Sequence, residues 1–183
     1  TKLGFMARAG RGMEVDLARA ATLHEKACSG GEATSCHYLG YVYLKGIGVT
    51  ADTARAEKLL QQACDGGEVR GCTTLASLLE SGSQIPKDEK RAAALYDKAC
   101  TGGELKGCAN LAAMALEGTA VAADPARALK LYEKACDGGE IASCIRQGDL
   151  LLGVKDIPPD LPKALILFES ACAKNLGEGC DAL

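Results

Sequence analysis

The chain has 183 residues, a formal net charge of −3 and 48% hydrophobic residues, with two Phe, five Tyr and no Trp. This weakly acidic balance, without an uncompensated basic patch, argues against nucleic-acid binding, which depends on neutralising phosphates. No apolar run approaches the roughly 20 residues that cross a bilayer, so we expect no membrane insertion.

Ten cysteines occur as five pairs, and the two members of each pair are eight residues apart. The first members advance by 36 residues each time. A strict period in this range is typical of a repeat solenoid, in which each unit packs only on its neighbours. The pairs are Cys28/Cys36, Cys64/Cys72, Cys100/Cys108, Cys136/Cys144 and Cys172/Cys180.

The first helix of each unit is predicted from apolar residues at helical spacing before the first cysteine. In one unit these are Ala56, Leu59, Leu60 and Ala63, which fall on one face of a helix. An Asp stands four residues before the first Ala of each unit, where a carboxylate caps the first turn and favours the positive end of the helix dipole. These N-cap candidates are Asp16, Asp52, Asp88, Asp124 and Asp160.

A basic residue follows each capping Asp by three positions. It could form a ladder for an acidic ligand, but we interpret it as a local Asp–Arg pair on an exposed first turn, because the Asp accompanies it every time. These basic residues are Arg19, Arg55, Arg91, Arg127 and Lys163.

A Gly-Gly pair at 30–31, 66–67, 102–103 and 138–139 is predicted to end the first helix, because glycine adopts the left-handed conformation without a clash. A Glu follows each pair, and a second helix then carries the second cysteine and a stripe such as Leu75, Leu78 and Leu79. The predicted fold is all-α, a right-handed α/α superhelical solenoid of 36-residue hairpins with one disulfide per hairpin and no strands.

The chain is expected to form a single repeat solenoid over residues 1–183. Its divisions are a partial unit at 1–16, units at about 17–52, 53–88, 89–124 and 125–160, and a partial last unit at 161–183. Since both ends interrupt a unit, we expect a segment of a longer array.

Seven residues, including Gly-Gly, separate the two cysteines of a pair, enough to fold a hairpin and bring the sulfurs together. Such a closed loop should constrain the unfolded chain by roughly 2–3 kcal/mol, and disulfides indicate an oxidising compartment. Two alternatives are free thiols in a cytosolic protein and a metal site completed by His24 and His37, although the spacing fits zinc poorly. We favour the disulfides, with no metal and no cofactor.

The segments 54–68, ARAEKLLQQACDGGE, and 39–49, LGYVYLKGIGV, resemble the Sel1-like repeat, a relative of the tetratricopeptide repeat. The paired cysteines make the chain similar to the Helicobacter cysteine-rich protein family. The resemblance implies intra-hairpin disulfides, export to the periplasm or outside, and a concave binding surface. It also implies a bacterial source, with the mitochondrial intermembrane space as the alternative location.

The sequence contains no recognisable catalytic motif, so an enzyme is not the favoured interpretation. Binding residues should lie on the second helix opposite its apolar stripe, where side chains vary between units. The candidates that combine contact area with hydrogen bonding are Tyr38, Tyr41, Asn110 and Arg146, although unconstrained surface would look alike.

The leading hypothesis is a non-enzymatic exported scaffold that binds a protein or peptide on its concave face. The alternative, implied by the resemblance alone, is a binder of β-lactams or peptidoglycan fragments with weak β-lactamase activity.

Overall fold

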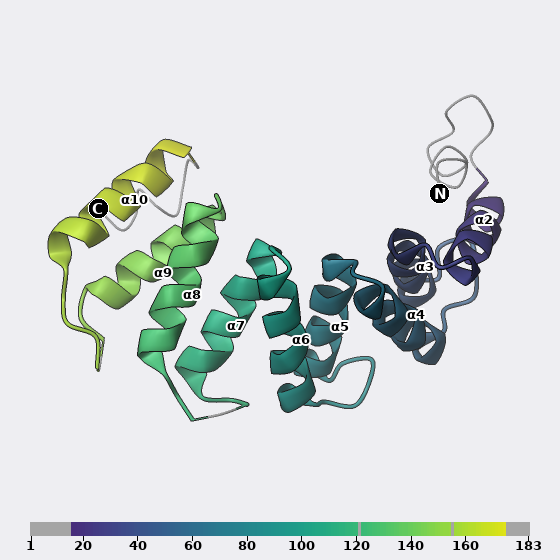
Figure 1. Cartoon of the computed structure of the whole chain (residues 1–183), viewed down its shortest axis with the longest axis horizontal. Helices are drawn as coiled ribbons and strands as arrows, with labels where there is room; N and C mark the ends of the chain where they lie inside the picture. Colours follow the sequence, from purple (N-terminus) through teal and green to yellow (C-terminus); the bar gives the residue numbers. More distant parts are fainter. Residues whose placement is uncertain (1–15, 121, 155, 175–183) are drawn as a thin grey trace. The chain divides into compact units, whose positions relative to one another are not determined.

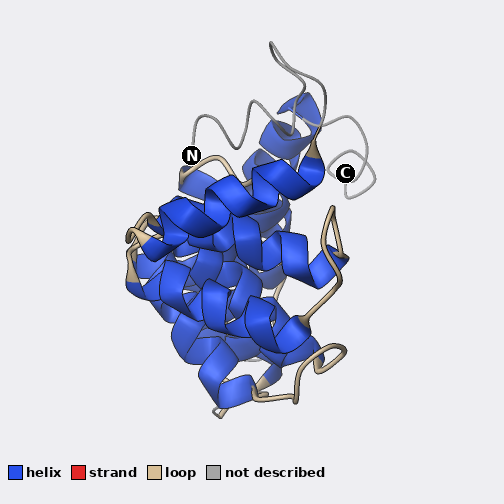
Figure 2. Ribbon diagram, turned by 90° about the vertical axis from the view of Figure 1, so that its right-hand side faces the viewer, coloured by secondary structure: helices blue, strands red, loops and turns tan. Residues whose placement is uncertain are grey.

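The computed structural model describes residues 16–120, 122–154 and 156–174, and these form nine helices and no strand (Figures 1 and 2). The all-helical prediction is confirmed for this part of the chain. Cys180 and nearly all of the partial unit 1–16 lie outside the described residues.

The chain divides into two compact units, residues 1–95 and 96–183, with the boundary inside helix α6 (Glu89–Thr101). In unit 1, each helix packs on the one that follows it in the chain, as in a solenoid. Unit 2 repeats this arrangement. Unit 1 contains α2 (Leu17–Ser29), α3 (Ala33–Lys45), α4 (Thr53–Asp65) and α5 (Val69–Ser81); unit 2 contains α7 (Leu105–Glu117), α8 (Pro125–Asp137), α9 (Ile141–Leu151) and α10 (Leu161–Lys174).

The predicted Asp caps are confirmed. In α4, Asp52 Oδ1 accepts a hydrogen bond of 2.9 Å from the backbone N–H of Arg55, which has no acceptor within the helix. The same bond, between a capping Asp and the backbone three residues later, occurs at Asp16, Asp88, Asp124 and Asp160.

Two kinds of glycine turn separate the helices. In the short turn, the second glycine of the pair takes a positive φ, +89° at Gly31, and the next residue closes the helix end because Glu32 N donates to Ala27 O at 3.0 Å. In the longer turn, a left-handed glycine such as Gly46, with φ +65°, ends the second helix. The Gly-Gly pair therefore ends the first helix as the sequence predicts, and a single left-handed glycine ends the second.

The core is built from the predicted Ala, Leu and Cys columns. Tyr96, Tyr132 and Phe168, which share one column, are 0%, 6% and 2% exposed, so these aromatics belong to the core. In unit 2, Tyr132 and Phe168 belong to one cluster with Ala112, Ala128 and other apolar residues.

Helix α9 departs from the other second helices. It has 11 residues where α3, α5 and α7 have 13. The glycine that follows it, Gly153, comes one place early in the repeat. Gln147 of α9 occupies the position that the buried Leu39 holds in α3. Gln147 is only 2% exposed, and its amide lies 3.5 Å from a Glu133 carboxylate oxygen, which partly satisfies this buried polar group.

Candidate functional site

Four disulfides join the two helices on either side of each Gly-Gly turn. Their sulfur atoms are 2.01–2.10 Å apart and their Cα atoms 4.5–4.7 Å apart. No cysteine is free in the described part of the chain, which contradicts the free-thiol and zinc-thiolate alternatives there. The confirmed pairs are Cys28–Cys36, Cys64–Cys72, Cys100–Cys108 and Cys136–Cys144.

The basic column does not form the local pairs that we expected. The capping Asp bonds to the backbone of the basic residue, while four of the five basic side chains reach the preceding hairpin. Arg91 donates to Glu57 at 2.7 Å and to Gln61 at 2.9 Å. The prediction of local pairs was wrong because stacked hairpins bring side chains about 30 positions apart in the chain next to each other. The other pairs are Arg55–Glu25, Arg127–Asp97 and Lys163–Glu133.

A second row of side chains caps helix ends across hairpins. Lys134 Nζ donates to the backbone carbonyl of Cys100 at 2.9 Å, and Gln62 Nε2 approaches that of Cys28 at 3.5 Å. A cation at a helix C-terminus also favours the negative end of the dipole. Consecutive hairpins are therefore joined through polar contacts as well as apolar ones.

The four candidate ligand-binding residues occupy equivalent helices in the two units. On α3, Tyr41 is 44% exposed, whereas Tyr38 is half-buried, its ring centroid 4.1 Å from that of His24. On α7, Asn110 is half-buried. On α9, Arg146 is exposed and lies 3.6 Å from the Asp149 carboxylate. The structure thus brings Tyr38 and Tyr41 onto one helix of unit 1, and Asn110 and Arg146 onto neighbouring repeats of unit 2.

Helices α3 and α5 are linked side by side through polar contacts. Thr34 Oγ1 donates to Glu68 at 3.0 Å, and His37 Nε2 lies 3.2 Å from Thr74 Oγ1. Because the Thr74 hydroxyl donates to the Arg70 carbonyl at 2.8 Å, its oxygen accepts from His37, which assigns the Nε2–H tautomer.

Two groups between these helices have shifted pKa values. Burial lowers the pKa of His37, against an opposing effect of the Glu68 carboxylate. The Arg70 side chain, hydrogen-bonded to Glu68 at 3.0 Å, holds the pKa of that carboxyl below its usual value. His37 is therefore neutral and Glu68 ionised at neutral pH.

A buried polar chain lies inside the first hairpin. Ser35 Oγ donates to Glu32 at 2.5 Å and lies 3.0 Å from His24 Nδ1, and both Ser35 and His24 are fully buried. In a hydrolase triad the histidine stands between the serine and the carboxylate, whereas here the serine is in the middle. This arrangement and its burial leave Ser35 unavailable as a nucleophile. The three hydrogen-bonded side chains therefore have a structural role in the core.

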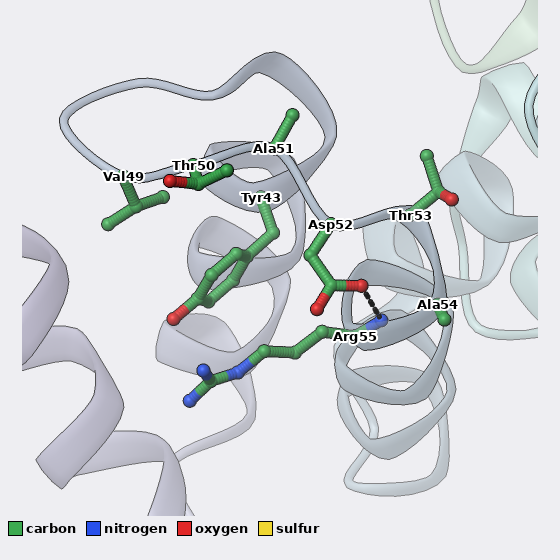
Figure 3. A pocket seen from close by; sticks show the side chains of 8 residues that line it. All are labelled: Tyr43, Val49, Thr50, Ala51, Asp52, Thr53, Ala54 and Arg55. Atoms are coloured by element: carbon green, nitrogen blue, oxygen red, sulfur yellow. Dashed lines mark hydrogen bonds between the residues drawn. The ribbon is translucent and has the colours of Figure 1, made fainter.

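A cavity of about 620 Å³ opens between the α3–α4 loop and the start of α4 (Figure 3). Tyr43 and Arg55 form its wall, with the guanidinium carbon 4.4 Å from the ring centroid. This site was not predicted from the sequence. The feature that could have indicated it is Tyr43, an aromatic residue at a position that holds Leu79, Ala115 and Leu151 in the other units.

Among the residues that the structure describes, no group of three or more His, Cys, Asp or Glu side chains is arranged to hold a metal ion. None of the described helices combines the length and apolar character that crossing a membrane requires.

Comparison with solved structures identifies proteins of the same fold. A Sel1 repeat protein from Oxalobacter formigenes is 24% identical over 95% of this chain and 72% of its own, with a TM-score of 0.89. A protective antigen of uropathogenic Escherichia coli with an SLR fold is 28% identical over 94% of this chain, with a TM-score of 0.84. This chain spans only 37% of that antigen.

A third structure, Helicobacter pylori cysteine rich protein B, is 31% identical over 71% of this chain and 93% of its own, with a TM-score of 0.57. No curated protein matches the chain.

The family model for the Sel1 repeat matches residues 1–32, 33–68, 70–104, 105–140 and 143–176. These repeats begin after the Gly-Gly turn, whereas the units defined above begin just after the Asp cap, although both advance by about 36 residues. Each disulfide therefore joins one family repeat to the next. With five matched repeats and this fold, the chain belongs to the Sel1 repeat family.

Proposed function

We propose that the chain is a non-enzymatic, exported scaffold that binds a protein or peptide partner. In unit 1 the binding surface is formed by α3 and α5, the second helices of their hairpins, on which the sequence predicts the binding residues. The observation that carries the proposal is Tyr41, which leaves 44% of its surface exposed on α3. Tyrosines that combine contact area with a hydrogen-bonding group are frequent anchors of protein interfaces.

The surroundings of Tyr41 support this proposal. On α5, Ser77 is exposed, and its hydroxyl offers hydrogen bonds to a peptide backbone. The bonds from Thr34 to Glu68 and from His37 to Thr74 hold α3 and α5 together before any partner arrives. A preformed surface loses less conformational entropy on binding.

The proposed export is supported by the four disulfides, which persist in oxidising compartments such as the periplasm or the extracellular space. Likeness to the Helicobacter and Escherichia coli proteins makes a bacterial source the better-supported choice.

The test is selection of peptides from a displayed random library on the oxidised chain, followed by affinity measurement for each selected peptide. Tyr41→Ser should weaken binding about tenfold or more, as expected for an interface anchor. Lys58→Ser, a matched change of an exposed residue on α4, should leave affinity unchanged. Failure to select any peptide, or equal effects of the two substitutions, would contradict the proposal.

A further inference from the structure

The cavity beside the α3–α4 loop has the features of a binding site separate from the α3–α5 surface. Its wall combines the Tyr43 ring, residues 49–51 of the loop and the first turn of α4 (Figure 3). At about 620 Å³ it has room for a side chain of a bound molecule.

Tyr43 is nine-tenths buried, yet its hydroxyl makes no hydrogen bond to any residue that the structure describes. The ring is held in place because the Arg55 guanidinium stacks on it, at 4.4 Å from the centroid. The hydroxyl oxygen itself is not fully buried, so it meets water at the edge of the cavity, and a hydrogen-bond donor of a ligand can replace that water.

The charges around the cavity favour a cation. Arg55 is neutralised by its ion pair with Glu25 of α2. The carboxylate of Asp52 lies in the cavity wall, and only its Oδ1 takes part in the cap to Arg55 N–H, at 2.9 Å. With Arg55 paired to Glu25, Oδ2 of Asp52 is the charged atom of the wall that is left to pair with a ligand, which favours a cation over an anion.

We propose that this cavity binds a basic side chain, an arginine of a partner chain in preference to a lysine. The guanidinium would donate to Asp52 Oδ2 and to the Tyr43 hydroxyl while its aliphatic stem packs on Val49 and Ala51. Arginine is preferred because its planar fork pairs with a carboxylate and packs against aromatic and guanidinium planes. This site would add a second contact to the proposed scaffold function, and it shares no residue with the binding surface around Tyr41.

The site is specific to one repeat. The Asp and the basic residue recur in every unit, but the position of Tyr43 holds Leu79, Ala115 and Leu151 elsewhere. Asp88, the equivalent cap in the next repeat, therefore provides a matched control for Asp52, because Leu79 stands there in place of Tyr43.

The experiment is a titration of the oxidised, isotope-labelled chain with N-acetylarginine amide, observed through backbone amide chemical shifts. N-acetylcitrulline amide, the neutral isostere, and acetate serve as comparison probes. Saturable shifts should appear at residues 49–55 with the arginine probe alone. Asp52→Asn should weaken binding about tenfold, because asparagine caps a helix equally well but lacks the charge.

Tyr43→Phe should also weaken binding, since the ring and its stacking on Arg55 remain while the hydroxyl is lost. Asp88→Asn should leave binding unchanged. Equal shifts with citrulline, shifts with acetate instead, or equal effects of Asp52→Asn and Asp88→Asn would each overturn the proposal. Since the probe is a small molecule, these outcomes are independent of whether a peptide binds the α3–α5 surface.

Discussion

Lys163 Nζ lies 2.8 Å from Glu133 Oε1, although the two residues are 30 positions apart in the chain. The pair joins the first turn of α10 to the third turn of α8, and the carboxylate raises the pKa of the lysine. Equivalent pairs in the other hairpins make this a regular contact between repeats and not an isolated surface ion pair.

A double-mutant cycle of Lys163→Met and Glu133→Gln should give a coupling energy of about 0.2–1 kcal/mol, because both side chains are substantially exposed. Thermal or urea unfolding measures it, and the coupling should shrink at high salt. A coupling of zero at low salt would show that the pair does not stabilise the repeat contact.

Gly148 and Phe168 form a close contact between α9 and α10. A Cβ at Gly148 would lie 2.6 Å from Phe168 Cε1, and the ring is 2% exposed. Gly148→Ala should therefore destabilise unit 2 by about 1–3 kcal/mol through overpacking, despite the better helix propensity of alanine. Phe168→Leu in the same chain should recover part of this loss. Unfolding midpoints of the single and double variants check this, and a stabilising Gly148→Ala would contradict the packing.

The pH dependence of stability should include a contribution from His37. Burial depresses its pKa in the folded state, so the neutral form is favoured there. This contribution is fully present above the unfolded pKa of about 6.5 and is lost as pH falls toward the lower folded value. Unfolding free energy measured between pH 7.5 and 5 should fall less steeply in His37→Gln. An unchanged slope would mean that His37 does not titrate with folding.

The disulfides should stabilise the chain without being required for helix formation. Cys100→Ala with Cys108→Ala should lower the free energy of unfolding by about 2–3 kcal/mol, because a closed loop restricts the unfolded chain. Circular dichroism should show most of the helix signal retained at low temperature and a lower unfolding midpoint. An unchanged midpoint would contradict this role.

The sequence was sufficient to predict the helices, their Asp and glycine ends, the core columns and the four described disulfides. These features repeat locally every 36 residues, so each signal is present several times. The Arg91–Glu57 pair was missed because it depends on how one hairpin stacks on the next, which a local i, i+3 rule does not include.

The Tyr43 cavity was missed for a different reason. Tyr43 occupies an apolar position of its helix and looks like a core residue in sequence. Only the structure shows that Arg55 covers its ring while its hydroxyl borders a cavity (Figure 3). The unusual residue in an otherwise regular column was the only available signal.

Hydrogen exchange of the oxidised chain, with and without a selected peptide, tests the central claim most directly. The proposed scaffold function predicts slower exchange on α3 and α5 when the peptide is bound, and loss of this protection in Tyr41→Ser. Protection confined to α2 and α4, or no protection at saturating peptide, would contradict binding on the proposed surface.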